Sequence, residues 1–260
     1  MLKELIISIQ GYFDAYRLVK DKQLWKWIII PGVINSLLLV VFFYYFMSSY
    51  NEATRWIFDK INLRSWLEHS FDSWLNFLFI MGKVFLDILL IFACFSFYKF
   101  FFLIIASPVF SLLSEKSNQI SGSSEFIIES RVLSHDIIRG IKVSVKNLCW
   151  QFIYIIGLLL LSIIPIAGWI SPLLLISIDC YFLGFSMLDY SNERKKLGIA
   201  QSADLISHHR GLAIGNGLIF YLLHLVPVLG WIFAPGFAVI AATLSLHRAQ
   251  EQKLIHYPNS

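Results

Sequence analysis

Four stretches of this chain are too apolar and too long for a water-soluble protein. Residues 27–47 hold no charged side chain over 21 positions, residues 148–178 none over 31 and residues 211–246 none over 36. The fourth, 75–113, covers 39 positions and is interrupted only by Lys83, Asp87 and Lys99. A helix needs about 20 residues to cross the hydrocarbon core of a bilayer, and lipid cannot hydrogen-bond an open backbone. We therefore expect an all-α integral membrane protein.

The composition favours the same class. Charged residues make up 15% of the 260 residues and hydrophobic residues 57%, whereas about a quarter of a soluble domain is charged. The apolar runs are continuous, so they lack the alternating pattern of membrane-barrel strands.

The last two apolar runs share a six-residue pattern that interrupts each run near its middle. The pattern P-x-x-G-W-I begins at Pro165 and again at Pro227, 62 positions later. Proline and glycine together punctuate a helix and permit a turn, so each run is predicted to form a helical hairpin with limbs of about 15 to 18 residues. Such limbs fit either bent full spans or re-entrant hairpins that turn inside the membrane. The predicted turn residues are Pro165, Gly168, Trp169, Pro227, Gly230 and Trp231.

Amphipathic and polar segments separate the apolar runs within a single membrane domain. In residues 1–26, Leu5, Ile9, Phe13 and Tyr16 recur at helical spacing, which predicts a helix lying on the membrane surface. A bend or break is expected near Ala106-Ser107-Pro108. The expected order is surface helix 1–26, span 27–47, extracytoplasmic segment 48–72 with a second surface helix, long span 75–113, cytoplasmic segment 114–147, hairpin 148–188, cytoplasmic segment 189–210 and hairpin 211–248.

Basic residues are distributed unevenly between the segments that flank the spans. If both late runs are hairpins, 16 Lys and Arg residues fall on one side of the membrane and 3 on the other, in the 48–72 segment. The positive-inside rule then places both ends of the chain in the cytoplasm.

The Cys, His and Ser residues form no pattern of a catalytic or metal site. Cys94, Cys149 and Cys180 lie singly inside apolar runs and are interpreted as core residues. The His residues have no zinc spacing, and the sequence holds no G-x-x-x-x-G-K-[ST] phosphate-binding loop. We expect no enzyme activity, no cofactor, no metal and no nucleic-acid partner.

Several short motifs follow one another in an order and spacing that together are specific. They are Leu18-Val19, Ile30-Pro31, Asn35-Ser36-Leu37-Leu38, Ala106-Ser107-Pro108, Leu112-Leu113-Ser114-Glu115, Ile164-Pro165, Asp189-Tyr190, Arg210, Val226-Pro227 and Pro235. From about Gly11 to Arg248 the chain thereby resembles the CysZ-type sulfate permease family, which belongs with the etoposide-induced membrane proteins.

The resemblance implies a fold, a location and a substrate. The implied fold has two long transmembrane helices and two pairs of hemi-penetrating helices, in homo-oligomers in the bacterial inner membrane. The implied function is proton-linked or channel-like entry of sulfate that feeds cysteine synthesis. In the family an Arg-Arg pair just before the first span contacts sulfate. The matching positions here are Trp25 and Lys26, so one cation of the pair is retained.

Two lysines are candidate anion-binding residues, each with a plainer interpretation. Lys26 lies at the N-terminal end of the first span, where free N–H groups and the helix dipole favour anions; alternatively it is an interfacial anchor. Lys99 lies deep in the second region and either faces a cavity or snorkels to the cytoplasmic edge. A continuous helix would place Lys99 on one face with Ser96, Ser107, Ser111 and Ser114.

Charged residues at the ends of the hairpins are candidates for a gate or an ion-pair network. Glu115, Asp189, Arg194 and Arg210 lie on the presumed cytoplasmic side. The plainer interpretation is that they are solvated helix ends or structural pairs. Lys83 and Asp87 are four residues apart and can pair on one helix face.

Taken together, these features favour a permease or channel for a small oxyanion, and the resemblance implies sulfate. The alternative is a non-transporting membrane scaffold of the etoposide-induced type. A membrane-bound enzyme acting on lipid is a weaker third hypothesis, because it needs titratable groups that converge at one depth.

Overall fold

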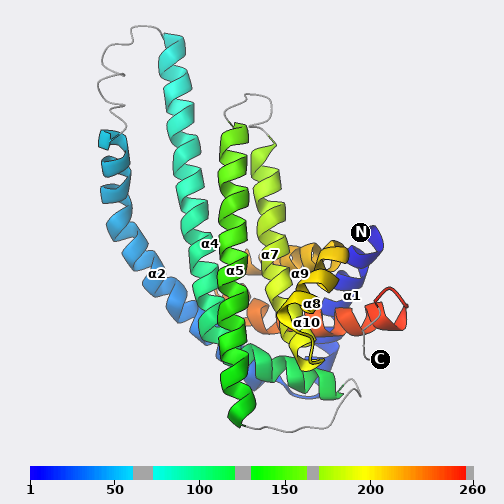
Figure 1. Ribbon diagram of the computed structural model, residues 1–260. Coiled ribbons are helices and arrows are strands. Elements are labelled where there is room, and N and C mark those ends of the chain that lie inside the picture. The colour runs from blue at the N-terminus through cyan, green and yellow to red at the C-terminus, as the bar shows by residue number, and fades with distance from the viewer. Residues whose placement is uncertain (61–72, 121–129, 163–169, 256–260) are drawn as a thin grey trace. The chain divides into compact units, whose positions relative to one another are not determined.

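Helices form all the regular secondary structure of the residues that the computed structural model describes, which are 1–60, 73–120, 130–162 and 170–255 (Figure 1). Four stretches of these residues are long and apolar enough to cross a membrane: Trp25–Ser49, Phe97–Ser117, Leu173–Arg194 and Leu229–Glu251. The prediction of an all-helical membrane protein is confirmed. The helices are α1 (Leu2–Asp21), α2 (Trp25–Lys60), α4 (Ser73–Ile120), α5 (Ser130–Ser162), α7 (Ser171–Arg194), α8 (Ile199–His208), α9 (Arg210–His224) and α10 (Leu229–Glu251).

The chain divides into two units. Unit 1 comprises Met1–Ser36 and Phe100–Ser260, and unit 2 comprises Leu37–Lys99. In unit 2 the aromatic side chains of α2 pack on those of α4. The ring centroid of Phe42 lies 5.5 Å from that of Phe95 and 5.0 Å from that of Tyr98. Unit 2 is therefore an aromatic-lined pair of helices.

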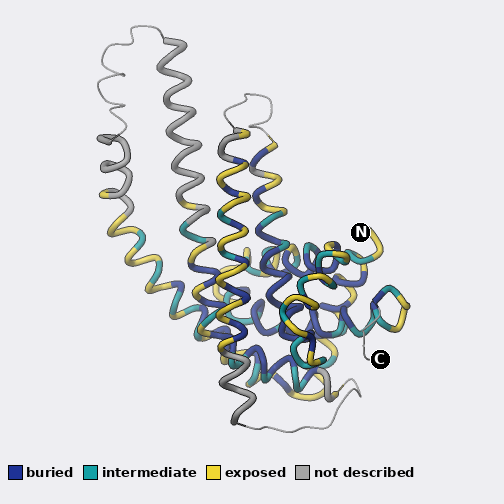
Figure 2. The backbone as a smooth tube through the Cα atoms, in the orientation of Figure 1, coloured by how far each residue is buried: buried dark blue, intermediate teal, exposed yellow. Residues whose placement is uncertain are grey.

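The core of unit 1 is formed by α1, α7, α9 and α10, where most buried residues gather (Figure 2). Helix α7 crosses α9 at small residues. A Cβ atom on Gly184 would lie 1.9 Å from the carbonyl oxygen of Ala213, and one on Gly217 would lie 2.0 Å from that of Cys180. Such close backbone approach is the usual way in which membrane helices pack when water supplies no driving force between them.

Helix α1 is held to α9 by hydrogen bonds to backbone carbonyls and to α10 by an ion pair. The Ser8 hydroxyl donates to the oxygen of Leu212 at 3.0 Å, and the Tyr12 hydroxyl donates to that of Asn216 at 2.9 Å. Arg248 on α10 pairs with Asp14 at 2.6 Å. The N-terminal helix is thus an integral part of unit 1.

The turn between α9 and α10 is tight and lies at the predicted Pro227. Val228 has φ 63° and ψ −60°, and Leu229 N donates to Pro227 O at 2.7 Å. This geometry is the γ-turn with positive φ, a rare and strained conformation for a β-branched residue. Gly230 is required next to it, because a Cβ atom there would lie 2.0 Å from the oxygen of Leu223. The first predicted turn, with Pro165, Gly168 and Trp169, lies outside the described residues.

Three of the four helices in the two hairpin regions are longer than the predicted 15 to 18 residues. Helix α5 has 33 residues, α7 has 24 and α10 has 23, whereas α9 has 15. The helices extend past the uncharged runs because polar residues beyond them, such as Arg139 and Asp189, find partners within the protein.

The two longest helices also extend beyond their predicted ends. Helix α2 continues to Lys60, so residues 48–60 prolong the first span rather than begin a separate surface helix; residues 61–72 lie outside the described part of the chain. A bend or break is predicted near Pro108, and helix α4 continues through Pro108 to Ile120 without a break. The part of α4 that belongs to unit 1 does change direction before the helix ends (Figure 1).

Candidate functional site

Buried charged side chains gather in unit 1 around the second half of α7. Charges inside a membrane protein are costly unless they are paired, and they commonly mark functional sites. Two guanidinium groups are held in this region, those of Arg139 on α5 and Arg194 at the end of α7. The two guanidinium groups have different sets of partners, and we therefore assign them different roles.

Arg139 forms a saturated pair with Asp189. Its Nη2 and Nε donate to the two carboxylate oxygens at 2.9 and 3.3 Å, and its Nη1 donates to the carbonyl oxygen of Leu197. The Ser202 hydroxyl on α8 also donates to Asp189. Arg139 is 6% exposed and Asp189 3% exposed. This two-pronged geometry, which is strong and specific, locks α5, α7 and α8 together.

Arg194 is held more loosely. Its Nη1 lies 3.3 Å from Oε2 of Glu115 on α4, and its Nη2 donates to the Ser111 hydroxyl one turn earlier on α4. The side chains of Arg194 and Glu115 are 13% and 17% exposed, so this pair is more open than the pair formed by Arg139. A guanidinium that contacts a carboxylate and a hydroxyl group can exchange the carboxylate for another oxyanion.

Three buried hydroxyl groups contact one another, and two of them are close to this ion pair in the sequence of α4 and α7. Ser114 on α4, Ser191 on α7 and Thr243 on α10 form a triangle with oxygen–oxygen distances of 3.2, 3.3 and 2.5 Å. Ser114 precedes Glu115, and Ser191 lies three residues before Arg194. We call Ser111, Ser114, Glu115, Ser191, Arg194 and Thr243 the Arg194 cluster.

Further polar contacts join α5 to α7. They lie toward the N-terminal end of α7, away from the Arg194 cluster. Asn147 Nδ2 donates to the Ser186 hydroxyl at 3.1 Å, and Gln151 Nε2 donates to Asp179 Oδ1 at 2.6 Å. All four side chains are buried. These side chains provide hydrogen-bond partners for one another and fix the position of α5 along α7.

The predicted anion-binding pair at the start of α2 separates into two different environments. Both residues are exposed, Trp25 at 37%, but the Trp25 ring also lies edge-on to Phe233 and Phe237 of α10, with centroids 5.9 and 6.3 Å away. A further cation lies beside them, because Lys116 Nζ lies 3.7 Å above the Trp27 ring. The structure therefore places Trp25 in a packing contact and two lysines near the beginning of the first span.

Lys99 and the serines predicted to share its face lie in different units. Lys99 is buried at the end of unit 2, whereas Ser107, Ser111 and Ser114 are buried in unit 1. The side chain of Ser96 lies outside the described residues.

The remaining predicted residues lie at helix ends. Arg210 is exposed at the start of α9, and its Nε donates to the nearby oxygen of Ser207 at 2.9 Å, so the structure does not bring it to Glu115 or Asp189. Trp231 belongs to the first turn of α10, where its carbonyl oxygen accepts from Asn35 of α2 at 3.0 Å. Among the predicted gate residues, only Glu115 and Arg194 come together.

Several residues of the site are not identified by the sequence analysis, above all Arg139, Ser191, Ser202 and Thr243. A polar residue inside a long apolar run is the only local signal, and Thr243 carries it. No group of three His, Cys, Asp or Glu residues in the described ranges has the arrangement of a metal site.

In the part of the chain that the structure describes, the helices include four candidate spans and carry buried, paired charges. The protein is therefore a multi-pass membrane protein. The sequence profile of the family described as sulfate transporter CysZ/etoposide-induced protein 2.4 matches residues 12–235. The chain belongs to this family.

Relatives over most of the chain are distant. A protein of Pseudomonas aeruginosa named sulfate transporter CysZ is 25% identical over 93% of this chain and 95% of its own length. The protein of the same name from Pseudomonas syringae pv. tomato is 28% identical over 66% of this chain and 68% of its own length. One from Pseudomonas fluorescens is 30% identical over 56% of this chain and 58% of its own.

Proposed function

We propose that this protein is a permease or channel for a small oxyanion, with sulfate as its substrate, in the bacterial inner membrane. The observation that carries the proposal is the Arg194 cluster, in which a largely buried guanidinium contacts the Glu115 carboxylate and the Ser111 hydroxyl. Membership of the family and the names of the relatives support sulfate as the anion.

The chemistry of the cluster suits a tetrahedral dianion. A path for such an anion has to replace bound water with fixed donors of moderate strength, so that the anion can also leave. The guanidinium fork matches the spacing of two oxygens of an oxyanion, and a hydroxyl can rotate to donate to an approaching oxygen.

Glu115 acts in this proposal as a tethered competitor of the transported anion. Its carboxylate occupies Arg194 when no anion is present. An incoming oxyanion displaces it, and the carboxylate returns when the oxyanion leaves. Asp189 is assigned to the structural network instead, because Arg139 and Ser202 saturate it.

Lys26 and Lys116 serve as the basic entrance to the path. Lys26 is exposed at the start of α2, and Lys116 is held on the neighbouring Trp27 ring. Exposed cations raise the local concentration of anions at a pore mouth. Trp25 takes no anion in this proposal, since its ring packs on α10. The arrangement is completed by the hemi-penetrating placement of both hairpins and by a homo-oligomer.

The proposal is tested by uptake of radiolabelled sulfate into proteoliposomes that contain the purified full chain. Arg194→Lys retains the charge but loses the fork, and it should lower uptake severalfold, as should Lys26→Ala. Lys146→Ala removes an exposed cation of α5 and is the matched control.

Insertion and folding are verified by protease protection and by the thermal unfolding midpoint. Correctly inserted protein that passes neither sulfate nor sulfite above the level of empty liposomes would overturn the proposal. It would favour the alternative of a non-transporting membrane scaffold.

A further inference from the structure

Helix α1 carries two apolar faces, and only one of them is covered by the protein. Ile7, Gly11, Tyr12, Ala15 and Val19 are buried, and the face they form packs against α9 and α10. The other face is a row of exposed apolar side chains, with Phe13 66% exposed and Tyr16 52% exposed. The full row, which we call the α1 stripe, is Leu2, Ile6, Ile9, Phe13 and Tyr16.

The α1 stripe is continuous along the helix. Its members are spaced by four, three, four and three residues, the spacing that keeps side chains on one line of a helix surface. Leu5, which the sequence pattern groups with this row, is half-buried, and its Cδ2 atom would lie 3.3 Å from a Cβ atom on Gly215. The outward line therefore runs through Leu2 and Ile6.

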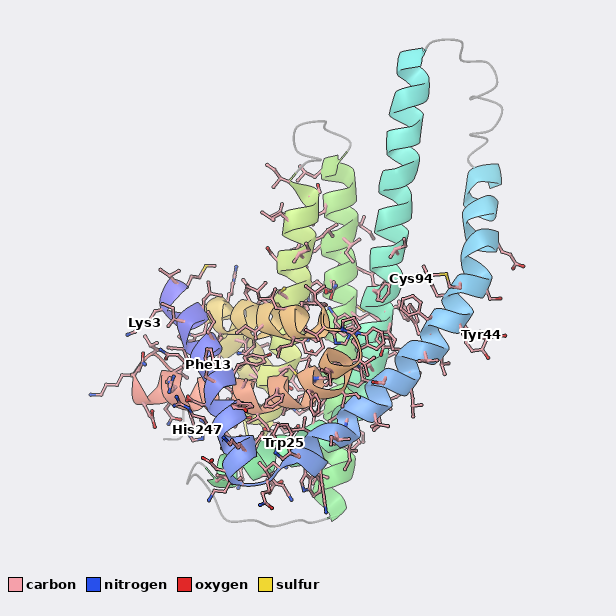
Figure 3. All side chains as sticks on the ribbon, turned by 180° about the vertical axis from the view of Figure 1, so that it is seen from behind. Lys3, Phe13, Trp25, Tyr44, Cys94 and His247 are labelled. Carbon is pink, nitrogen blue, oxygen red and sulfur yellow. The ribbon has the colours of Figure 1, made fainter. Side chains whose placement is uncertain are left out.

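The charged residues of α1 are also divided between the covered face and the exposed face. Glu4 is used inside unit 1, because its carboxylate accepts from Gly211 N at 3.0 Å and contacts His209 Nδ1 at 2.9 Å. Asp14 is paired with Arg248. The exposed charges of α1 are instead Lys3, Arg17, Lys20 and Asp21, so three of the four are basic. Figure 3 views the molecule from the side on which α1 lies and labels Lys3 and Phe13.

We infer that α1 docks on an anionic lipid surface, with the α1 stripe among the headgroups and upper acyl chains and with Lys3, Arg17 and Lys20 against lipid phosphates. A helix that is apolar on one line and cationic beside it has the composition of an interfacial helix. Basic residues near an anionic leaflet are attracted to its negative surface potential.

Lipid fits this face better than a second copy of the same helix. In a parallel or an antiparallel pair, two α1 helices would bring together faces that each carry Lys3, Arg17 and Lys20 against a single exposed acid, Asp21. Both arrangements juxtapose like charges, which destabilises a helix pair. Because α1 is fastened to α9 and α10 through Tyr12 and Arg248, docking on lipid would also stabilise unit 1.

The depth of the α1 stripe is measurable with spin labels on the full chain in vesicles. Cys94 and Cys149 are first replaced by Ser, since Cys149 is exposed and Cys94 is half-buried. Labels are then attached at Phe13→Cys and Ile9→Cys, with Asp21→Cys on the same helix as control. The vesicles consist of phosphatidylcholine and phosphatidylglycerol, and the measured quantity is each label's collision rate with oxygen divided by its collision rate with a water-soluble nickel complex. This ratio should be severalfold higher for the labels at 9 and 13 than for the label at 21.

The charge contribution is tested by K3Q/R17Q/K20Q against K142Q/K146Q/K196Q, which removes three exposed cations elsewhere. Compared with phosphatidylcholine alone, phosphatidylglycerol should bury the labels at 9 and 13 more deeply and raise the unfolding midpoint. Only the first set of substitutions should abolish these two effects. Equal water exposure at 9, 13 and 21 would overturn the inference, as would dipolar broadening between labels at 13, which identifies a second copy as the occupant. These measurements involve no anion flux, so their failure is distinct from failure of the proposed transport function.

Discussion

Arg194 at the end of α7 donates to Glu115 on α4 with an Nη1–Oε2 distance of 3.3 Å, while its Nη2 donates to Ser111 on the same helix. The contact joins the last residue of one apolar helix to the last turns of another. Both partners lie among the last residues of their candidate spans, Phe97–Ser117 and Leu173–Arg194.

We predict that Glu115→Gln lowers the sulfate concentration that gives half-maximal uptake by severalfold. The amide cannot compete for Arg194 as a carboxylate does, so the guanidinium is available to the anion more of the time. Concentration-dependent sulfate uptake into proteoliposomes measures the effect. Glu251→Gln, which changes an exposed carboxylate at the end of α10, is the control. An unchanged half-maximal concentration in a folded Glu115→Gln protein would show that Glu115 does not compete with the anion.

The Arg139–Asp189 pair should behave as a structural lock. Removing one partner of a buried ion pair costs about 3 to 5 kcal/mol, so Asp189→Asn should greatly reduce the free energy of unfolding in detergent. The control Asp204→Asn alters an exposed carboxylate on α8, and we expect a change within about 0.5 kcal/mol. Sulfate uptake per inserted molecule should stay close to wild type for Asp189→Asn. A stable Asp189→Asn protein with abolished uptake would instead place Asp189 in the anion path.

A single methyl group at the α7–α9 crossing should destabilise the protein. Gly217→Ala would place a Cβ atom 2.0 Å from the oxygen of Cys180, and overpacking of this kind costs about 1 to 3 kcal/mol. Gly157→Ala is the matched control on α5, where nothing lies within 4 Å of an added Cβ. There the change should be neutral or stabilising by up to about 1 kcal/mol, since alanine favours a helix. Unfolding midpoints in the same detergent compare the two, and equal midpoints would contradict the close crossing.

The apolar runs and their proline and glycine breaks were sufficient to predict the all-helical fold and the place of the α9–α10 turn. Lipid leaves the backbone few options, so length and hydropathy decide the class directly. Helix lengths were harder to predict, because a helix continues wherever its polar residues find partners. The extension of α7 to Arg194 depends on such partners, which lie on α4, α5 and α8.

The candidate site shows the same limit. Glu115 and Arg194 stand out in the sequence as charges at the ends of apolar runs. Their local sequence does not indicate that these two residues, 79 positions apart, form an ion pair. Arg139 lies in an amphipathic stretch that also contains Lys142 and Lys146, which are exposed. Only the packing of α5 on α7 selects Arg139 as the buried one.

Trp25 and Lys26 should respond oppositely to two measurements. Trp25→Ala removes edge-on contacts with Phe233 and Phe237. Since an aromatic pair contributes about 0.5 to 1.5 kcal/mol beyond its buried area, the unfolding midpoint should fall. Lys26→Ala should leave the midpoint unchanged, because the side chain is exposed, and should lower sulfate uptake at low salt. Loss of uptake with Trp25→Phe, which retains an aromatic ring, would return Trp25 to the anion site.

Lys195 should make stability rise with pH on the alkaline side. Burial lowers the pKa of Lys195 from about 10.5 to about 8, and its Nζ donates to Gln250 Oε1 at 2.8 Å just beyond the apolar part of α7. Between these two pKa values the unfolded chain binds the proton and the folded protein does not, so raising the pH favours the folded state. The destabilisation is fully present below pH 8 and is relieved as the pH approaches 10.5. Lys195→Gln should therefore gain less stability than wild type between neutral and alkaline pH, whereas Lys196→Gln, at an exposed neighbour, should follow wild type. Unfolding midpoints measured across this range check the difference, and identical slopes for all three proteins would show that Lys195 stays protonated in the folded state.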